Sequence, residues 1–362
     1  MSAMSERGDE RNGHTAAEAQ NELALMGRAL GGLRWVQGPG GNVSVKVDNG
    51  ELWVKASGKR LGEVAHEGGH ARVPLDIATR ALDGDAEADR DLFGRTPRPS
   101  LETYFHALGG RVVAHTHALG VLLYACSTSP YERVLGQGSG IALPAELSSR
   151  VFSIPYVRPG RGIALAMRDV LGSARGEALI VLRSHGVVAM AETAARAIAL
   201  TEMLDEAVRH RFGSLPDIDA LAPRYADSPV ATVEGGVFRR LPPRVAREAS
   251  PPRYLFPDAP VCASLVQVGA LTDLPAVSAL AARALAEWKR ACILVDAEGR
   301  RAAVARSAAQ LEHTCEVVAG HDWLEDALRA HGVAQYLDDD EPAGILSLPA
   351  EQYRIRLGEK TC

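Results

Sequence analysis

Along the first 213 residues, segments with the hydrophobic periodicity of helices alternate with short apolar segments typical of strands. Apolar residues that recur every three to four positions predict helices, and short apolar runs between turn residues predict strands. We therefore expect helices over 16–32, 100–108, 121–126 and 193–210, and strands over 42–47, 51–55, 111–117 and 178–189, the last interrupted by a His-Gly step. Mixed strands and helices of this kind predict a three-layer α/β/α domain around a central sheet.

The second half of the chain begins with a different pattern. Residues 214–258 are rich in proline and arginine, which predicts a linker or a wrapping arm. The α/β pattern returns from residue 259, with a helix expected over 274–290, a strand over 291–296 and a helix over 323–331 that Asp322 caps. No internal repeat is evident. We therefore expect a flexible tail over 1–15, a larger α/β domain over 16–213, the linker or arm over 214–258 and a smaller accessory α/β domain over 259–362.

Composition narrows the class of protein. The 362 residues are 46% hydrophobic and 23% charged, and a formal net charge of −5 gives no sign of a nucleic-acid-binding surface. No apolar run reaches the ~18 residues of a membrane span, and the polar N-terminus lacks the apolar core of a secretory signal. The five cysteines include no Cys-x-x-Cys pair, which indicates a reducing compartment and argues against a cysteine zinc site. We expect a cytoplasmic protein that binds neither nucleic acid nor membranes.

The strongest chemical signal is a group of histidines with one carboxylate. Residues i and i+2 of a strand point to the same face, so His115 and His117 can direct two imidazoles at one point. Glu102 precedes this pair, and His185 interrupts an apolar strand run further along the chain. Three imidazoles bind zinc and leave one coordination position for substrate oxygens. We therefore predict a metal site formed by His115, His117 and His185, with Zn²⁺ as the expected ion and another divalent metal as the alternative.

Five motifs in a fixed order carry a resemblance to a known family. They are Gly40-Gly41-Asn42-Val43-Ser44-Val45-Lys46, Val54-Lys55-Ala56-Ser57-Gly58, Pro99-Ser100-Leu101-Glu102-Thr103, His115-Thr116-His117 and Val157-Arg158-Pro159-Gly160. Over roughly residues 17–212 the chain resembles the class II (zinc-dependent) aldolase and adducin-head family, most of all the aldolase part of the rhamnulose-1-phosphate aldolase/alcohol dehydrogenase fusions. No Gly-x-Gly-x-x-Gly follows a strand, so we do not expect the complete dinucleotide-binding domain of those fusions.

This resemblance implies a class II aldolase-like metal-binding domain and a zinc-dependent lyase reaction. In the family, the glutamate at the position of Glu102 is the acid/base, which moves a proton on or off carbon. The expected reaction forms or cleaves a C–C bond in a ketose phosphate, or a similar anionic hydroxy-carbonyl substrate, through a metal-stabilised enediolate. Glu146 is the next candidate for the base, and His106 either orients Glu102 or is a structural histidine. The family also implies a homo-oligomer, a four-fold symmetric tetramer.

The family's phosphate-binding positions correspond to Gly41, Asn42, Ser57, Gly58 and Ser100. Backbone N–H groups in glycine-containing turns and small hydroxyls suit an anion. Many phosphate-using relatives carry a second serine where this chain has Leu101, which removes one hydroxyl donor. Lys59 or Arg60 can compensate for that loss.

Two other functions remain open at this stage. An epimerase, dehydratase or decarboxylase of a sugar or sugar phosphate uses the same metal-enolate step. Related epimerases carry aspartate at the position of Glu102, so the glutamate favours aldol chemistry. A non-catalytic adducin-like scaffold is the third reading, and it is less consistent because adducin heads have lost metal ligands whereas this chain keeps all three histidines.

Overall fold

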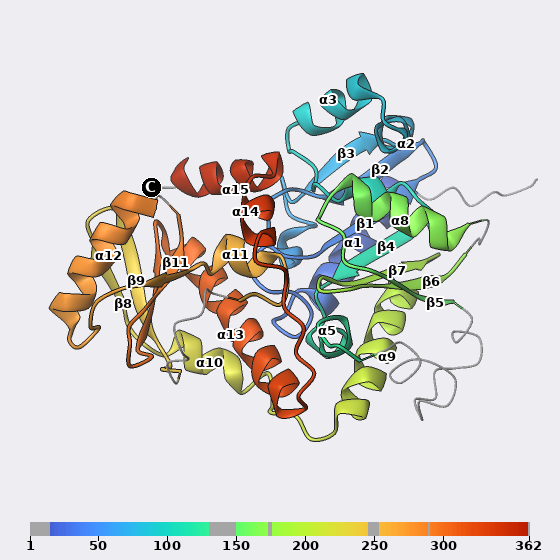
Figure 1. The fold of residues 1–362 in the computed structure, drawn as a ribbon. Coiled ribbons are helices and arrows are strands. Elements are labelled where there is room, and N and C mark those ends of the chain that lie inside the picture. The colour runs from blue at the N-terminus through green and yellow to red at the C-terminus, as the bar shows by residue number, and fades with distance from the viewer. Residues whose placement is uncertain (1–14, 130–149, 173–175, 245–252, 289, 361–362) are drawn as a thin grey trace, which may run out of the picture.

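A seven-stranded sheet forms the centre of the first half of the chain (Figure 1). The structure is a computed structural model, and it describes residues 15–129, 150–172, 176–244, 253–288 and 290–360. The strands of this sheet are β1 (Asn42–Val47), β2 (Glu51–Lys55), β3 (His70–Pro74), β4 (Val112–Thr116), β5 (Val151–Ile154), β6 (Ala178–Leu182) and β7 (Gly186–Ala191). Their order is β3-β2-β1-β4-β7-β6-β5, so β4 lies in the middle of the sheet.

Turn residues fix the register of the strands that position β4. Gly50 has φ of 81°, a left-handed conformation that suits glycine in the Asp48-Asn49-Gly50 turn between β1 and β2. The hairpin pairs Val47 with Glu51, and β1 then pairs with β4 on its other side. Since β4 also pairs with β7, each end of β4 is held between two neighbours.

Helices cover both faces of the first sheet. One face carries α1 (Ala16–Leu30), α5 (Leu119–Ala125) and α9 (Ala194–Phe212), with the 3-10 helix η1 (Leu61–Glu63) beside α1. The other face carries α2 (Leu75–Asp83), α3 (Ala86–Gly94), α4 (Thr103–His106) and α8 (Arg161–Leu171). Leu23, Leu122 and Leu204 are buried in the core of the first face. Leu82, Phe105 and Met167 are buried in the core of the second. The predicted three-layer α/β/α architecture is therefore confirmed.

A second α/β region follows, built on a five-stranded sheet of order β10-β11-β12-β9-β8. Its strands are β8 (Val230–Val233), β9 (Gly236–Leu241), β10 (Leu265–Gln267), β11 (Cys292–Val295) and β12 (Arg301–Ala305). Its helices are α10 (Leu221–Ala226), α11 (Asp258–Cys262), α12 (Leu274–Trp288), α13 (Ala308–Ala330), α14 (Glu341–Leu346) and α15 (Pro349–Lys360). The long helix α13 contacts this sheet and also α5, so it lies between the two sheets (Figure 1). The exact division of the chain into domains stays a prediction.

The second sheet repeats part of the topology of the first. In the first sheet, β5 and β6 are parallel and joined through α8, β6 and β7 are an antiparallel hairpin, and α9 follows. In the second, β10 and β11 are parallel and joined through α12, β11 and β12 are an antiparallel hairpin, and α13 follows. The fourth neighbour is antiparallel in both sheets, β4 beside β7 and β9 beside β12. The chain therefore contains a structural repeat that its sequence does not reveal.

Three local predictions need correction. Residues 214–258 are more than a linker, because β8 and β9 belong to the second sheet. Asp322 lies inside α13 and caps no helix there, since the helix runs unbroken over Ala308–Ala330 and Ser307 is its N-cap. The helix expected over 100–108 is reduced to α4, with Glu102 just before its first residue. Glu146 lies outside the described residues.

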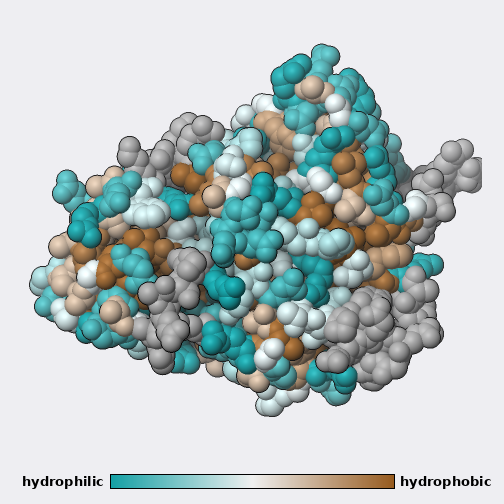
Figure 2. All heavy atoms as spheres, in the orientation of Figure 1, coloured by the Kyte–Doolittle hydropathy of each residue, from teal (hydrophilic) through white to brown (hydrophobic). Residues whose placement is uncertain are grey.

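The surface of the molecule is mostly hydrophilic on the face drawn in Figure 2, with apolar side chains gathered over α12 and the second sheet. Val230, Leu274 and Trp288 are exposed apolar side chains of this region. Among the helices that the structure describes, none combines the length and the apolar character needed to cross a membrane.

Candidate metal centre

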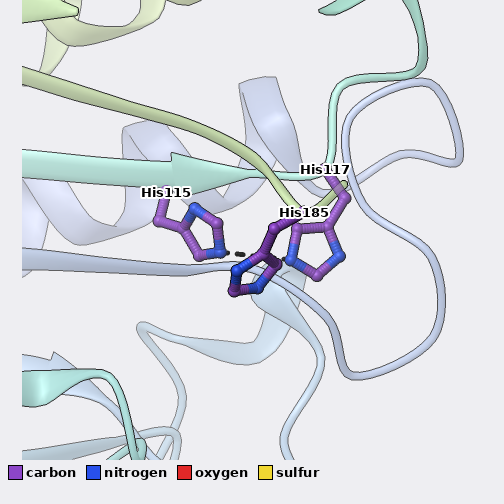
Figure 3. A group of neighbouring side chains, drawn as sticks. All are labelled: His115, His117 and His185. Atoms are coloured by element: carbon purple, nitrogen blue, oxygen red, sulfur yellow. Dashed lines mark hydrogen bonds between the residues drawn. The ribbon is translucent and has the colours of Figure 1, made fainter. Parts of the chain in front are cut away.

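Strand β4, the residue that follows it and one tight turn bring three histidines together at one end of the first sheet. His115 lies in β4, where it pairs with Asn42 of β1 and Val188 of β7. His117 comes directly after β4, and His185 lies in the turn between β6 and β7. Figure 3 shows the three rings turned toward one another from these separate segments. The structure thus brings together the three residues that the sequence predicted as metal ligands.

The backbone of the β6–β7 turn is shaped by the close approach of neighbouring atoms. Ser184 has φ of 51°, a left-handed conformation that is uncommon for a residue with a side chain. A Cβ atom at Gly186 would lie 2.3 Å from the carbonyl oxygen of Thr116, so no larger residue fits there. The His-Gly step of the sequence therefore has a physical reason: the glycine lets the turn that carries His185 approach the end of β4.

The side-chain nitrogens of the three histidines have the spacing of metal ligands. All the ligand atoms lie within 4.8 Å of one another, and the Nε2 atoms of His115 and His117 are 3.1 Å apart. Two zinc–nitrogen bonds of ~2.0–2.1 Å at a tetrahedral angle would separate their nitrogens by about 3.3 Å. The spacing of these two Nε2 atoms is therefore close to that of a tetrahedral site.

Burial keeps two of these imidazoles, those of His115 and His185, neutral. His115 is fully buried, and burial lowers its pKa even though the neighbouring Glu102 carboxylate raises it. For His185 the same balance lowers the pKa to about 3. Because a neutral imidazole carries a lone pair on one ring nitrogen, both residues are in the protonation state that binds a divalent ion.

Polar partners at the outer ring nitrogens orient two of the three histidines. The Nδ1 of His115 donates to the carbonyl oxygen of Val187 at 3.0 Å, which leaves its Nε2 lone pair facing the centre. The Nδ1 of His117 lies 2.7 Å from a carboxylate oxygen of Asp258. Partners of this kind fix the tautomer and the ring orientation of metal ligands.

The carboxylate of Glu102 lies beside the ligand nitrogens. Its Oε2 is 3.4 Å from Nε2 of His115, and its Oε1 is 3.3 Å from Nε2 of His185. Burial raises the pKa of Glu102, but the neighbouring imidazoles and the amide of Asn42 outweigh that effect and lower it below the usual value. Glu102 is therefore ionised at neutral pH, as a base must be before it accepts a proton.

A row of buried side chains holds Glu102 in place. Asn42 donates from Nδ2 to Oε2 of Glu102 at 2.8 Å and to the hydroxyl of Ser100 at 3.2 Å. His106 bonds through Nε2 to the amide oxygen of Asn42, and its Nδ1 lies 2.7 Å from the hydroxyl of Ser44. Burial lowers the pKa of His106 to about 3, so its ring is neutral. His106 thus reaches Glu102 only through Asn42, and not directly.

The residues present fit a divalent metal ion. In addition to the convergent Nε2 atoms, Oε1 of Glu102 is a buried carboxylate oxygen with no hydrogen-bond donor among the described residues. A buried, unsatisfied carboxylate oxygen that faces imidazole nitrogens costs free energy unless a cation lies near it. His115, His117 and His185 would hold the ion, and Glu102 would lie next to it.

The expected phosphate-binding positions lie in two adjacent turns and one loop beside this centre. The backbone N–H of Ser57 bonds to the carbonyl oxygen of Arg98, and that of Ser100 bonds to the carbonyl oxygen of Lys55. Gly41 and Gly58 have φ of 63° and 79°, so both turns need glycine. The side-chain amide of Asn42 already donates hydrogen bonds to Glu102 and Ser100. Whether these residues bind an anion stays a prediction.

The two cations expected to compensate for Leu101 differ in their surroundings. Arg60 forms an ion pair with Glu316 of α13 at 2.7 Å, and Glu316 also accepts a hydrogen bond from the backbone N–H of Gly38 at 3.0 Å. Lys59 is exposed. The guanidinium of Arg60 is therefore engaged with the second α/β region, and Lys59 is the more accessible cation.

A second cluster of possible ligands, His321, Asp322 and Glu325, lies in α13. Asp322 forms ion pairs with Arg244 and Arg301 at 2.8 and 2.7 Å, and it accepts a hydrogen bond from Tyr225. Two guanidinium groups already neutralise this carboxylate and would repel a cation. We interpret this cluster as a structural ion-pair network.

Sequence reasoning missed Asp258 and the role of the Asn42 side chain. Asp258 lies far along the chain from His117, in a stretch that the sequence predicted as a linker, and no motif surrounds it. Asn42 was expected to bind substrate, and its place one strand away from His115 could have suggested a contact with Glu102.

Comparison with known proteins gives a consistent result for the first half of the chain. The sequence model described as Class II Aldolase and Adducin N-terminal domain matches residues 21–211, more than half of the 362 residues. This range contains Glu102 and the three histidines, and it ends before Asp258.

Individual relatives are distant. The chain is 27% identical over 192 residues to the uncharacterized oxidoreductase YuxG of Bacillus subtilis (strain 168), covering 48% of this chain and 26% of that protein. It is 34% identical over 84 residues to the methylthioribulose-1-phosphate dehydratase of Microcystis aeruginosa, covering 23% of this chain and 36% of that protein. The chain thus spans well under half the length of these curated relatives. The N-terminal class II aldolase domain of a conserved protein from Thermoplasma acidophilum matches with 25% identity and a TM-score of 0.43, covering 57% of this chain and 99% of that one.

Proposed function

Because the chain belongs to the class II aldolase and adducin N-terminal domain family, we propose that it is a divalent-metal-dependent aldolase. Its substrate is a ketose phosphate or a similar anionic hydroxy-carbonyl compound, in which it forms or cleaves a C–C bond. One observation carries the proposal: the carboxylate of Glu102 lies 3.3–3.4 Å from Nε2 atoms of two of the three convergent histidines. This arrangement places a base next to the position of a Lewis acid.

Each part of the centre has a role in this reaction. A divalent ion held by the three histidines supplies Lewis acidity toward the oxygens of a hydroxy-carbonyl substrate. In the direction of C–C bond formation, a carboxylate oxygen of Glu102 takes the proton from the carbon next to the carbonyl group. Asn42 donates to Oε2, so it fixes the direction in which the carboxylate points. In the cleavage direction, the hydroxyl on the carbon that becomes the aldehyde gives up its proton as the C–C bond breaks. Glu102 takes up this proton and delivers it to the carbon next to the carbonyl group of the other fragment.

The terminal anion of the substrate is proposed to bind at the turns of Ser57-Gly58 and Gly41, with Ser100 beside them. Glycine-containing turns and small hydroxyls suit phosphate oxygens. The backbone N–H groups of Ser57 and Ser100 already bond to carbonyl oxygens, so these two residues would contribute their hydroxyls. Lys59 is the available cation of this neighbourhood, because Arg60 is paired with Glu316. These assignments rest on the match to the family's phosphate-binding positions.

A dehydratase is the second candidate. The relative from Microcystis aeruginosa carries that activity in its name and is 34% identical over 84 residues. Dehydration of a ketose phosphate also starts with removal of a proton next to the carbonyl, so the same carboxylate serves both reactions. A non-catalytic scaffold is less consistent, because a scaffold has no use for a buried, ionised carboxylate among three ligand-type histidines.

The test is a product analysis with a panel of ketose 1-phosphates and the full-length protein supplied with Zn²⁺. An aldolase releases dihydroxyacetone phosphate and an aldehyde, whereas a dehydratase releases water and leaves a single phosphorylated product of lower mass. If mass spectrometry finds only the dehydrated product, the dehydratase replaces the aldolase. Turnover of no substrate by metal-loaded protein contradicts both.

Zinc as the metal, a tetrameric assembly and a cytoplasmic location are further proposals that the family resemblance supports. We also propose that the region from residue 259 is an accessory domain of the same site, because its Glu316 accepts a hydrogen bond from Gly38 and Asp258, just before it, contacts His117.

A further inference from the structure

Asp258 reaches the metal centre from the second half of the chain. It is the first residue of α11, which begins after the range that the family model matches. Asp258 is 6% exposed, and its Oδ2 lies 2.7 Å from Nδ1 of His117. A carboxylate removed from water to this extent needs a close partner, because an isolated buried charge costs several kcal/mol. His117 provides such a partner.

The geometry of His117 separates the two sides of its ring. Its Nε2 faces Nε2 of His115 at 3.1 Å, on the side where the three histidines converge. Its Nδ1 faces Asp258 on the opposite side of the ring. Asp258 is therefore placed to accept the Nδ1 proton, which leaves the lone pair on Nε2. The two atoms lie within hydrogen-bonding distance but not in hydrogen-bonding orientation, so a rotation of either side chain completes the hydrogen bond.

A glycine makes room for this contact. A Cβ atom at position 40 would lie 2.9 Å from Oδ2 of Asp258 and 2.9 Å from Nδ1 of His117. The backbone of Gly40 has no positive φ that would itself require glycine. The same Cβ atom would also lie 2.9 Å from the carbonyl oxygen of Gln37, so the pair and this backbone atom together leave no room for a side chain.

The three histidines differ in what their outer nitrogens contact. His115 donates to a neutral backbone carbonyl, that of Val187. Nδ1 of His185 has no hydrogen-bond partner among the described residues. His117 alone has a carboxylate there. An anionic acceptor increases the electron density and basicity of the imidazole more than a carbonyl does, so it strengthens the bond from Nε2 to a cation.

We infer that Asp258 is a positioning residue of the metal centre, which fixes the tautomer of His117 and strengthens it as a ligand. This inference rests on the metal site of the proposed function. It also assigns a purpose to the second half of the chain, which contributes one side chain to a centre whose ligands all belong to the first half.

The variants Asp258→Ala and Asp258→Asn test the inference in the full-length protein. Asn keeps the size of the side chain but removes its charge, so it separates the effect of charge from the effect of volume. Gly40→Ala is an independent variant, because its methyl group enters the space between Asp258 and His117. Glu316→Gln is the matched control, since Glu316 is another carboxylate that joins α13 to the first half and touches none of the three histidines.

Two measurements are made on chelator-stripped protein. The first is the affinity for Zn²⁺, determined by competition with a chromophoric chelator. The second is the visible absorption of the Co²⁺-loaded protein, which reports on the ligand field and not on turnover. Removal of a partner of this kind typically weakens metal affinity by ~10–100-fold. We expect that loss for Asp258→Ala and Gly40→Ala, a smaller loss for Asp258→Asn, and wild-type affinity and spectrum for Glu316→Gln.

Thermal unfolding of the metal-free variants separates a specific effect from misfolding, because Asp258→Asn should melt close to the wild type. Affinities of all Asp258 variants within twofold of the wild type, with an unchanged Co²⁺ spectrum, would overturn the inference. So would an equal loss of affinity in Glu316→Gln. The outcome is independent of the reaction: if the wild type binds Zn²⁺ tightly and cleaves no substrate, the aldolase assignment fails while the role of Asp258 stands.

Discussion

Substitution of Glu102 by Gln isolates the charge of the proposed base from its position. Gln has nearly the same shape, and its amide oxygen can still accept the hydrogen bond that Asn42 donates at 2.8 Å. His115 and His117 keep their orientations, because those depend on Val187 and Asp258. The variant should therefore fold and should bind metal, while it can no longer accept a proton.

The expected loss of rate follows from the contribution of a single acid/base group. Such a group typically contributes ~10²–10⁴-fold to kcat. At about 1.36 kcal/mol per tenfold, this is about 2.7–5.4 kcal/mol of activation free energy. Little of it should come from lost substrate binding, so KM should change far less than kcat.

The assay measures release of dihydroxyacetone phosphate from the best ketose phosphate at saturating Zn²⁺. Metal content is measured on the same samples, and Glu316→Gln provides the control for loss of a carboxylate outside the centre. A Glu102→Gln variant that keeps its metal and turns over within threefold of the wild type would refute the role of Glu102. Glu146 would then be the next candidate for the base.

The remaining predictions concern the ligands, the packing and the second half of the chain. His115→Ala should lose bound metal and turnover together, as measured by mass spectrometry of the metal; full metal occupancy would contradict this. Gly41→Ala should lower the free energy of urea unfolding by about 1–3 kcal/mol, because a Cβ there would lie 2.5 Å from Val36; Gly50→Ala has similar strain but open space, and an equal loss in both would contradict the packing argument. Burial lowers the pKa of His321, whose Nε2 accepts from the backbone N–H of Leu255. Stability should therefore fall as the pH drops below the unfolded value of about 6.5, and His321→Gln in metal-free protein should flatten that fall; an unchanged slope would argue against it. Truncation after residue 213 should give insoluble or inactive protein, since α13 packs against α5, and a soluble, active fragment would show that the second half is dispensable.

Much of the first half could be predicted because local signals and packing agree there. The Asp48-Asn49-Gly50 turn and the cap Thr193 define elements that the structure contains at nearly the same bounds. The short helix α4 was less predictable. Ser100 accepts from the backbone N–H of Glu102, and Thr103 bonds back to Ser100, so this segment forms a turn in place of the first helical turn.

The second half could not be predicted in the same way. Its strands are short, and β8 and β9 lie among prolines and arginines that favour a linker by composition. The repeated topology is not visible in the sequence because the equivalent turns differ. The β6–β7 turn of the first sheet contains His185, whereas the β11–β12 turn of the second contains Asp296. There, Asp296 accepts backbone hydrogen bonds from Leu271, Glu298 and Arg300. A turn held by one carboxylate needs no sequence similarity to a turn that presents a metal ligand.

In the candidate site, too, local features could be predicted from the sequence and tertiary contacts could not. Spacing alone identifies His115 and His117, and the His-Gly step identifies His185, because each signal is local. The contact between Asp258 and His117 depends on how two distant segments pack, and no local pattern predicts such a contact. Tertiary structure therefore adds the residues that hold the ligands, whereas the sequence indicates the ligands themselves.

The central claim is that the three histidines hold a metal ion on which C–C bond cleavage depends. Its most direct test is the cleavage rate of chelator-stripped protein, measured on a ketose 1-phosphate panel while Zn²⁺ is titrated back. We predict that the rate rises from near zero and saturates at one equivalent of Zn²⁺ per chain. A rate that is independent of added metal, or no cleavage at full occupancy, would contradict the account.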